Sequence, residues 1–262
     1  MRSSHIRLEV HGPVAHIIID RPEKRNALNL EMWQSIPPCI AAAESNPDVK
    51  AIIVRGVDDT AFAAGADISQ FHERFESVDS TQTYVDGVHG AEDALSKCLK
   101  PVIAMIHGDC VGGGVEIAIA CDLRFCSSNS RFGITPAKLG ICYSMASTRR
   151  VSQSIGPSKT KDLLFTGRLI DAETAGAWGL ADRVYAPEDL NRETDAFVAQ
   201  ICRNSQYSIR YTKRVMRDVM AGGTEEADDI FALRLGAYEA GDLKEGIAAF
   251  KEKRRPSFGW NE

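Results

Sequence analysis

The sequence predicts an α/β fold in which most strands run parallel. Two continuous apolar runs of strand length, at 51–55 and 102–106, indicate strands buried within a sheet. Each run is followed by a segment rich in small residues and then by a helical pattern, an alternation typical of parallel sheets. From about residue 188 onward the spacing is helical. We therefore expect a mixed core at 1–187 and a C-terminal helical region at 188–262.

The other strands of the core are short. Residues 6–10 and 14–20 predict an antiparallel hairpin across a His-Gly-Pro turn, and residues 123–126 predict one more strand. Asp171 is placed to cap a short helix, and a last strand fragment follows at 184–185.

The predicted helices carry one irregularity. A helical pattern begins near Leu30, but Pro37 and Pro38 fall within it. A proline removes a backbone hydrogen bond and clashes with the preceding turn, so we expect a break or kink there. Helical spacing in the last third covers 209–220, 225–238 and 242–250, with glycines between the segments.

Composition points away from several classes of function. The chain of 262 residues has a net charge of −5, which argues against a nucleic-acid partner. Its seven cysteines include no CxxC pair, so we expect all of them to be small buried hydrophobes and we expect no metal site. There is no run of 18 apolar residues, which argues against a membrane partner. These features predict a soluble protein of a reducing, cytoplasmic compartment.

The most informative segment joins the strand at 102–106 to a helix. Three glycines, Gly112 to Gly114, stand directly before the helical pattern that starts at Val115. Glycines let a backbone approach a ligand closely, and a helix N-terminus offers unpaired N–H groups to an anion. The anion can be a phosphate or an oxyanion that develops during catalysis, and the Gly-Lys-Ser/Thr of a Walker loop is missing. A tight turn without any ligand is the alternative.

A second segment, AFAAGADI at 61–68, has the same character. Its side chains are nearly all small, and Asp67 and Gln70 have the spacing of a capping box, which predicts a helix from Ile68. The N–H of Ala66 then stands at another helix entrance. Two amides aimed at one point form an oxyanion pocket.

Together these segments resemble the enoyl-CoA hydratase/isomerase (crotonase) family. The resemblance rests on RPEKRNALN at 21–29, AFAAGADI at 61–68 and GGGVEIAIACDLRF at 112–125, and it continues in order to residues 249–254. It implies a spiral of repeated ββα units followed by a C-terminal helical trimerisation region. It also implies an acyl-CoA substrate, with CoA as part of that substrate and no prosthetic group, and a homotrimer or a hexamer made of two trimers.

The resemblance also implies catalytic roles. The amides of Ala66 and Gly113 are expected to bind the thioester oxygen. Glu116 matches the first catalytic carboxylate of the family and is expected to move a proton at the carbon adjacent to the thioester carbonyl, or one carbon further. Taken alone, a glutamate in the first turn of a helix is more often a surface residue favoured by the helix dipole.

Seven further positions match family residues that contact CoA. Four of them are expected to line the ligand, mainly through the backbone: Asn26, Ala27, Leu28 and Ala64. Arg25 is expected to bind a phosphate. Phe250 and Lys253 are expected to close over the nucleotide, often from a neighbouring subunit. The alternatives are a solvated charge for Arg25 and Lys253 and a core aromatic for Phe250.

The sequence departs from the family hydratases at one important position. Ala137 stands where they carry a second glutamate, and Ser144 stands where some isomerases carry an acidic residue. Tyr143 is similar to a tyrosine that orients a substrate carboxylate in family decarboxylases, or else it is a wall of the acyl pocket. Hydration, isomerisation and decarboxylation therefore stay open, as does a weakly active CoA-binding structural member. A serine hydrolase is disfavoured because no GxSxG elbow is present.

Four other polar residues near these motifs are expected to be structural. His107 and Asp109 are interpreted as a strand-end histidine and a turn aspartate. Ser147 and Thr148 are interpreted as caps of a helix that begins nearby.

Overall fold

The computed structural model describes residues 5–259, and its strands form two sheets. The larger has six strands in the order β1-β2-β3-β5-β7-β10, and the smaller has four in the order β4-β6-β8-β9. The large sheet is parallel except for the β1–β2 hairpin, and the small sheet is parallel except for β8–β9. The strands are β1 Ile6–His11, β2 Val14–Ile19, β3 Ala51–Gly56, β4 Ala61–Ala63, β5 Val102–Ile106, β6 Asp109–Val111, β7 Leu123–Ser127, β8 Arg131–Gly133, β9 Leu169–Asp171 and β10 Arg183–Tyr185.

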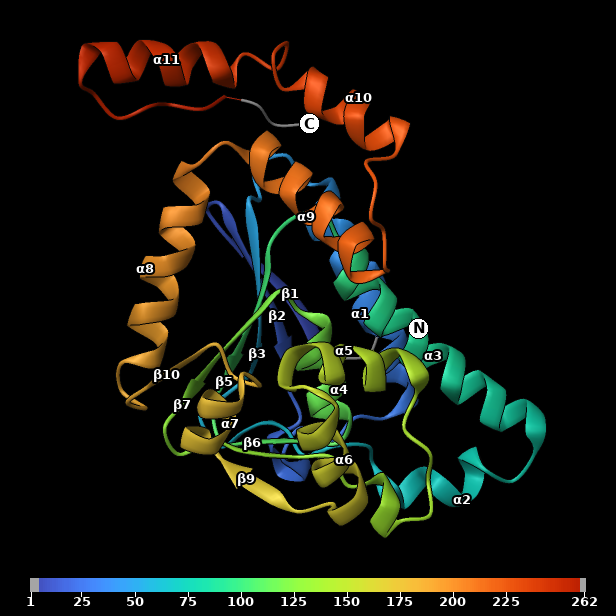
Figure 1. Cartoon of the computed structure of the whole chain (residues 1–262). Helices are drawn as coiled ribbons and strands as arrows, with labels where there is room; N and C mark the ends of the chain where they lie inside the picture. The colour runs from blue at the N-terminus through green and yellow to red at the C-terminus, as the bar shows by residue number, and fades with distance from the viewer. Residues whose placement is uncertain (1–4, 260–262) are drawn as a thin grey trace.

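Successive strand pairs build a spiral (Figure 1). In β3–β4, β5–β6 and β7–β8 the first strand belongs to the large sheet and the second to the small one. After these pairs come helices α3 (Val78–Lys97), α4 (Gly113–Ala120) and α5 (Met145–Ile155). This arrangement confirms the predicted α/β fold with repeated ββα units.

The central strands are buried on both faces, which explains why their sequences are continuously apolar. Ile52 and Val54 of β3 point into a core shared with α1 (Leu30–Ser45), α3 and α4. Ile53 points the other way, into a second core with Leu190 and Val198 of α8 (Leu190–Arg203). Successive side chains of a strand point to opposite faces of the sheet, so two adjacent isoleucines pack into two different cores.

Helix α1 shows where the sequence prediction was wrong. We expected a break or kink at Pro37 and Pro38, and the break is absent, because the helix runs continuously from Leu30 to Ser45. Trp33, Ile36 and Ile40 on its inner face are at most 2% exposed. Burial of three large side chains stabilises the helix by roughly 5–9 kcal/mol in total, which is comparable to the roughly 6 kcal/mol that two prolines cost a helix interior.

The remaining helices agree with the predicted pattern. Asp171 caps α7, because its side chain accepts a hydrogen bond from the Thr174 N–H at 2.8 Å. Three C-terminal helices continue the helical region that α8 begins, and α10 and α11 lie beyond α9 at the top of Figure 1. The other helices are α2 Phe71–Arg74, α6 Pro157–Thr166, α7 Ala172–Trp178, α9 Gln206–Met220, α10 Asp228–Gly236 and α11 Asp242–Glu252. Over residues 5–259, no helix combines the length and apolar character needed to cross a membrane.

Gly114 is fixed by the close packing of α4 against β4. A Cβ atom at this position would lie 2.4 Å from the Ala63 carbonyl oxygen, a backbone atom that cannot rotate away. We predict that Gly114→Ala lowers the free energy of unfolding by about 1–3 kcal/mol, the usual cost of overpacking. Gly90, inside α3, has no atom within 4 Å of such a Cβ. Gly90→Ala is the matched control and should stabilise by about 0.5–1 kcal/mol. Urea unfolding measures the change in unfolding free energy for both variants. Equal changes would contradict the close contact between Gly114 and the Ala63 carbonyl.

Candidate functional site

The site is built on a backbone pairing between residues 25–28 and 64–67. The Leu28 N–H donates to the Gly65 carbonyl at 2.7 Å, and the Asp67 N–H donates to the Leu28 carbonyl at 2.9 Å. These two bonds bracket Ala66 in a parallel bridge. In such a bridge the N–H of the bracketed residue faces away from its partner strand. The Ala66 amide is therefore turned away from Leu28.

A glycine contact brings a second amide close by. Gly65 and Gly112 both have positive φ, 108° and 52°, and a Cβ built on Gly112 would lie 3.7 Å from the Gly65 Cα. At Gly113 a side chain would come within 2.9 Å of the Trp33 ring. Ala66 and Gly113 both line the same cavity, and within residues 5–259 no acceptor takes a hydrogen bond from either amide. Two free donors of this kind suit an oxyanion.

The cavity has a volume of about 770 Å³. One wall is aromatic: Phe71, Phe75 and Tyr84 contact one another edge to face, with ring centroids 5.2–6.4 Å apart. Cys142 also lines this cavity and is exposed, while Cys39 is half-buried. The prediction that all seven cysteines are buried is therefore wrong for these two. Cys142 lies beside the cavity, and Cys39 lies on a partly covered face of α1.

Glu116 stands in the first turn of α4 and lines the cavity. Its N–H donates to the Gly112 carbonyl at 3.1 Å, so the carboxyl is tied to the glycines that carry the amides. Only its cavity side is open, and burial raises the pKa of Glu116 to about 8. The negative charge of Glu92 adds to the rise and Arg150 opposes it. The carboxyl is thus mostly protonated at neutral pH, unlike a dipole-favoured surface glutamate.

Tyr143 lies beside Glu116 in the cavity wall. Burial is the main cause of a Tyr143 pKa well above its ordinary value, and the charge of Glu116 contributes. Among the described residues the hydroxyl has no hydrogen-bond partner, so it is a free donor. Ser144 instead caps α5 by accepting from the Ser147 N–H at 3.0 Å. The helix cap is therefore Ser144 rather than Ser147 or Thr148.

Glu92 was not predicted from the sequence, although it is a charged residue that is only 1% exposed. It lies four positions after Val88 and three before Leu95, on the buried face of α3. One signal in the sequence could have identified Glu92: it is a charged residue at a position where the helical period requires an apolar one.

The segment at 25–28 lies next to this site, where its backbone pairs with residues 64–67. Arg25 is exposed and lies 3.6 Å from the Asp109 carboxylate, and its carbonyl accepts from the Ala64 N–H at 3.0 Å. Asn26 is fully buried, and its side-chain amide donates to the Ala61 carbonyl at 2.7 Å. Leu28 is also fully buried. Asn26 and Leu28 thus hold the two segments together, while Arg25 and Ala27 face outward or partly so.

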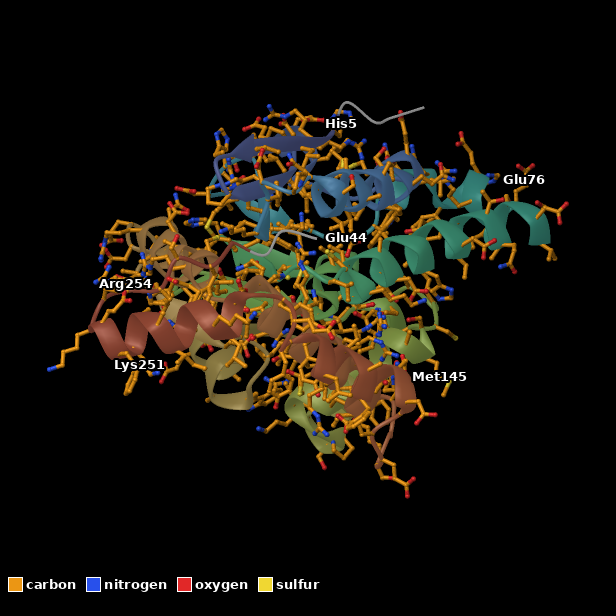
Figure 2. All side chains as sticks on the ribbon, turned by 90° about the horizontal axis from the view of Figure 1, so that it is seen from above. His5, Glu44, Glu76, Met145, Lys251 and Arg254 are labelled. Carbon is orange, nitrogen blue, oxygen red and sulfur yellow. The ribbon has the colours of Figure 1, made fainter. Side chains whose placement is uncertain are left out.

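Phe250 and Lys253 lie elsewhere in the single chain. Phe250 is 86% exposed on α11 and lines a separate hollow with Tyr207 and Arg234. Figure 2 shows Lys251 of the same helix well apart from Met145, which lines the Glu116 cavity. One chain therefore does not bring Phe250 or Lys253 to the cavity, and Phe250 is not a core aromatic there.

The remaining polar residues have structural partners. His107 contacts Asn191 at 3.2 Å and Asp59 at 3.4 Å, and Asp109 accepts two hydrogen bonds from Arg131. His107 follows the end of β5 as expected, but Asp109 is the first residue of strand β6 rather than a turn residue. Among residues 5–259 no group of three or more His, Cys, Asp or Glu side chains is arranged to hold a metal ion.

The chain belongs to the enoyl-CoA hydratase/isomerase family, whose sequence model matches residues 9–261. It is similar to a crotonyl-CoA hydratase from Syntrophomonas wolfei, 33% identical over 98% of this chain and 99% of that protein. A short-chain-enoyl-CoA hydratase from Clostridium acetobutylicum is 32% identical over 97% of both chains. The solved structure of an enoyl-CoA hydratase/isomerase family protein from Hyphomonas neptunium matches with a TM-score of 0.95 and 42% identity over 98% of both chains. The first two relatives are named as hydratases of CoA derivatives, which supports the prediction that this chain is an enzyme.

The pKa of Glu116 has a consequence for stability. It rises from an ordinary 4.5 to about 8 on folding, so the folded protein keeps a proton that the unfolded chain releases. The stabilisation is complete below 4.5 and is lost as the pH rises toward 8. We predict that the wild type loses stability relative to Glu116→Gln across this interval, measured by urea unfolding at a series of pH values. Glu31→Gln, a change at an exposed first-turn glutamate of α1, should follow the wild type. Parallel curves for all three proteins would refute the shift.

Proposed function

We propose that this protein is an acyl-CoA enzyme that forms an enolate from its thioester substrate. The amides of Ala66 and Gly113 hold the thioester oxygen, and Glu116 transfers a proton at the α-carbon or the γ-carbon. The observation that carries the proposal is the meeting, in one cavity, of two unpaired backbone amides and a buried carboxyl.

The two amides supply the electrostatic part of the reaction. Negative charge moves onto the thioester oxygen as the enolate forms, and fixed N–H dipoles stabilise that charge without reorganising. Loss of one such donor costs about 10²–10³-fold in rate. Both positions need only a backbone amide, and Gly113 in addition has no room for a side chain beside Trp33.

Glu116 supplies the proton transfer. With a pKa of about 8, its acid form prevails at neutral pH, so it is suited to deliver a proton to the enolate carbon. For proton removal the carboxylate is needed, and that rate should rise with pH up to about 8. Microscopic reversibility lets one carboxyl do both in an isomerase.

The second carboxylate of a family hydratase has no counterpart at Ala137. That residue is exposed on a short 3-10 helix, and the cavity is lined by its neighbour Pro136 instead. Tyr143 offers a neutral hydroxyl beside Glu116. We therefore propose proton transfer at carbon as the common step and leave hydration, isomerisation and decarboxylation to be separated by their products.

The CoA part of the substrate is proposed to lie along the 25–28 segment, with Arg25 near its phosphates and the backbone at Ala27 and Ala64 against the rest. Asn26 and Leu28 are fully buried and would support this segment from behind. Phe250 and Lys253 would then reach the nucleotide from a neighbouring subunit of a trimer or hexamer. Exposed apolar side chains on α10 and α11 support such an assembly through region 188–262: Phe231, Leu233, Leu235, Leu243, Ile247 and Phe250.

Hydrogen exchange at carbon tests the proposal before the product is known. In D2O the protein should introduce deuterium at the α-carbon of butyryl-CoA or the γ-carbon of crotonyl-CoA, and mass spectrometry of the recovered thioesters detects both. Glu116→Gln should lower the exchange rate by about 10²–10⁴-fold with little change in binding. Glu31→Gln, at an exposed first-turn glutamate of α1, should leave it unchanged.

Two outcomes would contradict this function. If Glu116→Gln kept more than about a tenth of the exchange rate, well above the usual loss for an acid–base group, Glu116 would not be the proton-transfer residue. If the wild type bound both thioesters and exchanged neither, the protein would be a CoA-binding structural member of the family.

A further inference from the structure

A second buried carboxyl lies behind the site. Glu92 on α3 is 1% exposed and does not line the cavity. The Ser147 hydroxyl donates to one of its oxygens, and the Arg150 guanidinium donates to the other at 3.1 Å. Arg150 is itself held by Ser96 at 3.1 Å. A buried charge that is paired and fully hydrogen-bonded is a costly arrangement, which suggests a purpose beyond packing.

This group is close enough to Glu116 for their charges to interact. Helix α4, which carries Glu116, packs against both α3 and α5, which carry Glu92 and Arg150. The charge of Glu92 acts on Glu116 and on Tyr143. The pair is therefore one titrating system in which two carboxyls compete for a proton.

Hydrogen bonding decides which carboxyl keeps the proton. Burial raises the pKa of Glu92 above its ordinary value, and the donors Ser147 and Arg150 reduce that rise. Glu116 accepts no hydrogen bond on its carboxyl from residues 5–259, and burial raises its pKa to about 8. Donors favour the charged form and burial without donors favours the neutral form, so charge settles on Glu92 and the proton on Glu116.

We propose that Glu92 is a positioning residue of this active site: it remains ionised between Ser147 and Arg150, and its charge keeps the proton on Glu116. In the absence of substrate, Glu116 is then protonated and faces the cavity. This inference depends on the proposed role of Glu116 in proton transfer and adds the group that controls its state.

Other titratable groups around Glu116 do not replace Glu92 in this role. From α3, Tyr84 has its pKa raised to about 12 by burial, so it is neutral. His89 lines the cavity but is exposed to solvent. Tyr143 stays protonated. Strands β6 and β7 bring the buried thiols of Cys110 and Cys126, while Asp109 of β6 is paired with Arg131 and Arg124 of β7 is paired with Asp182. Glu92 and Arg150 are thus the charges that act on the carboxyl.

If Glu92 only held α3 and α5 together, two conservative variants would behave in the opposite order from that expected if its charge matters. Glu92→Gln keeps the size but removes the charge, whereas Glu92→Asp keeps the charge but shortens the side chain. If only hydrogen bonding and packing matter, Gln should resemble the wild type more than Asp does. If the charge matters, the order is reversed.

Infrared spectroscopy of the unliganded protein reads the state of Glu116 directly. The C=O stretch of a protonated carboxyl is assigned from the difference between wild type and Glu116→Gln, and its pH midpoint is then followed. In Glu92→Gln the midpoint should fall by about one pH unit, the effect of losing a nearby like charge. In Glu92→Asp it should stay near that of the wild type.

A double variant keeps the test valid if Glu92→Gln fails to fold with an unpaired Arg150. Glu92→Gln combined with Arg150→Met leaves no unpaired buried charge, and such replacements are often tolerated. Its midpoint should lie between those of Glu92→Gln and the wild type, because Glu92 outweighs Arg150 in its effect on Glu116. An unchanged midpoint in whichever of these variants folds, or a larger fall in Glu92→Asp than in Glu92→Gln, would overturn the proposal. The titration needs no substrate, so failure of the proposed function would leave the midpoints unaffected.

Discussion

The site depends on a backbone contact rather than on any side chain. Leu28 donates one and accepts the other of the two hydrogen bonds that flank Ala66, and this pairing turns the Ala66 amide away from Leu28. Gly65 and Gly112 then let the second segment approach until the Gly113 amide lines the same space. A Cβ at Gly114 would lie 2.4 Å from the Ala63 carbonyl oxygen and would push the two segments apart. The two amides are therefore fixed before any ligand arrives, which is the condition for strong electrostatic stabilisation.

The same tight packing sets the chemistry of Glu116. A cavity wide enough for an acyl chain but closed by aromatic and aliphatic walls removes water from the carboxyl and raises its pKa to about 8. In water this glutamate would be ionised and would be a poor acid at neutral pH. The junction between β6 and α4 thus carries one of the two amides, that of Gly113, and the protonated carboxyl of Glu116 one turn further along.

Local signals in the sequence predicted most of the fold and suggested the two amides of this site. The strands at 51–56 and 102–106 were recognisable because burial on both faces leaves almost only apolar residues, and Ala66 and Gly113 lie in segments whose composition is unusual on its own. The role of Glu116 came instead from the family resemblance. The pairing of Glu92 with Arg150 could not be found in this way, because it joins residues 58 positions apart and arises only when α3 and α5 pack together. Pro37 and Pro38 misled for the same reason, since tertiary burial of α1 outweighs a local preference.

The central claim is that two fixed amides polarise the thioester carbonyl, and the carbonyl itself reports on this directly. Isotope-edited infrared difference spectroscopy with an acyl-CoA labelled by ¹³C at the thioester carbon follows its C=O stretch when it binds to Glu116→Gln, which prevents turnover. Donation from Ala66 and Gly113 should weaken the bond and shift the stretch clearly below its frequency in water. A stretch at or above the aqueous frequency would mean that the oxygen does not lie between these amides, and it would contradict the assignment of Ala66 and Gly113 as the oxyanion donors.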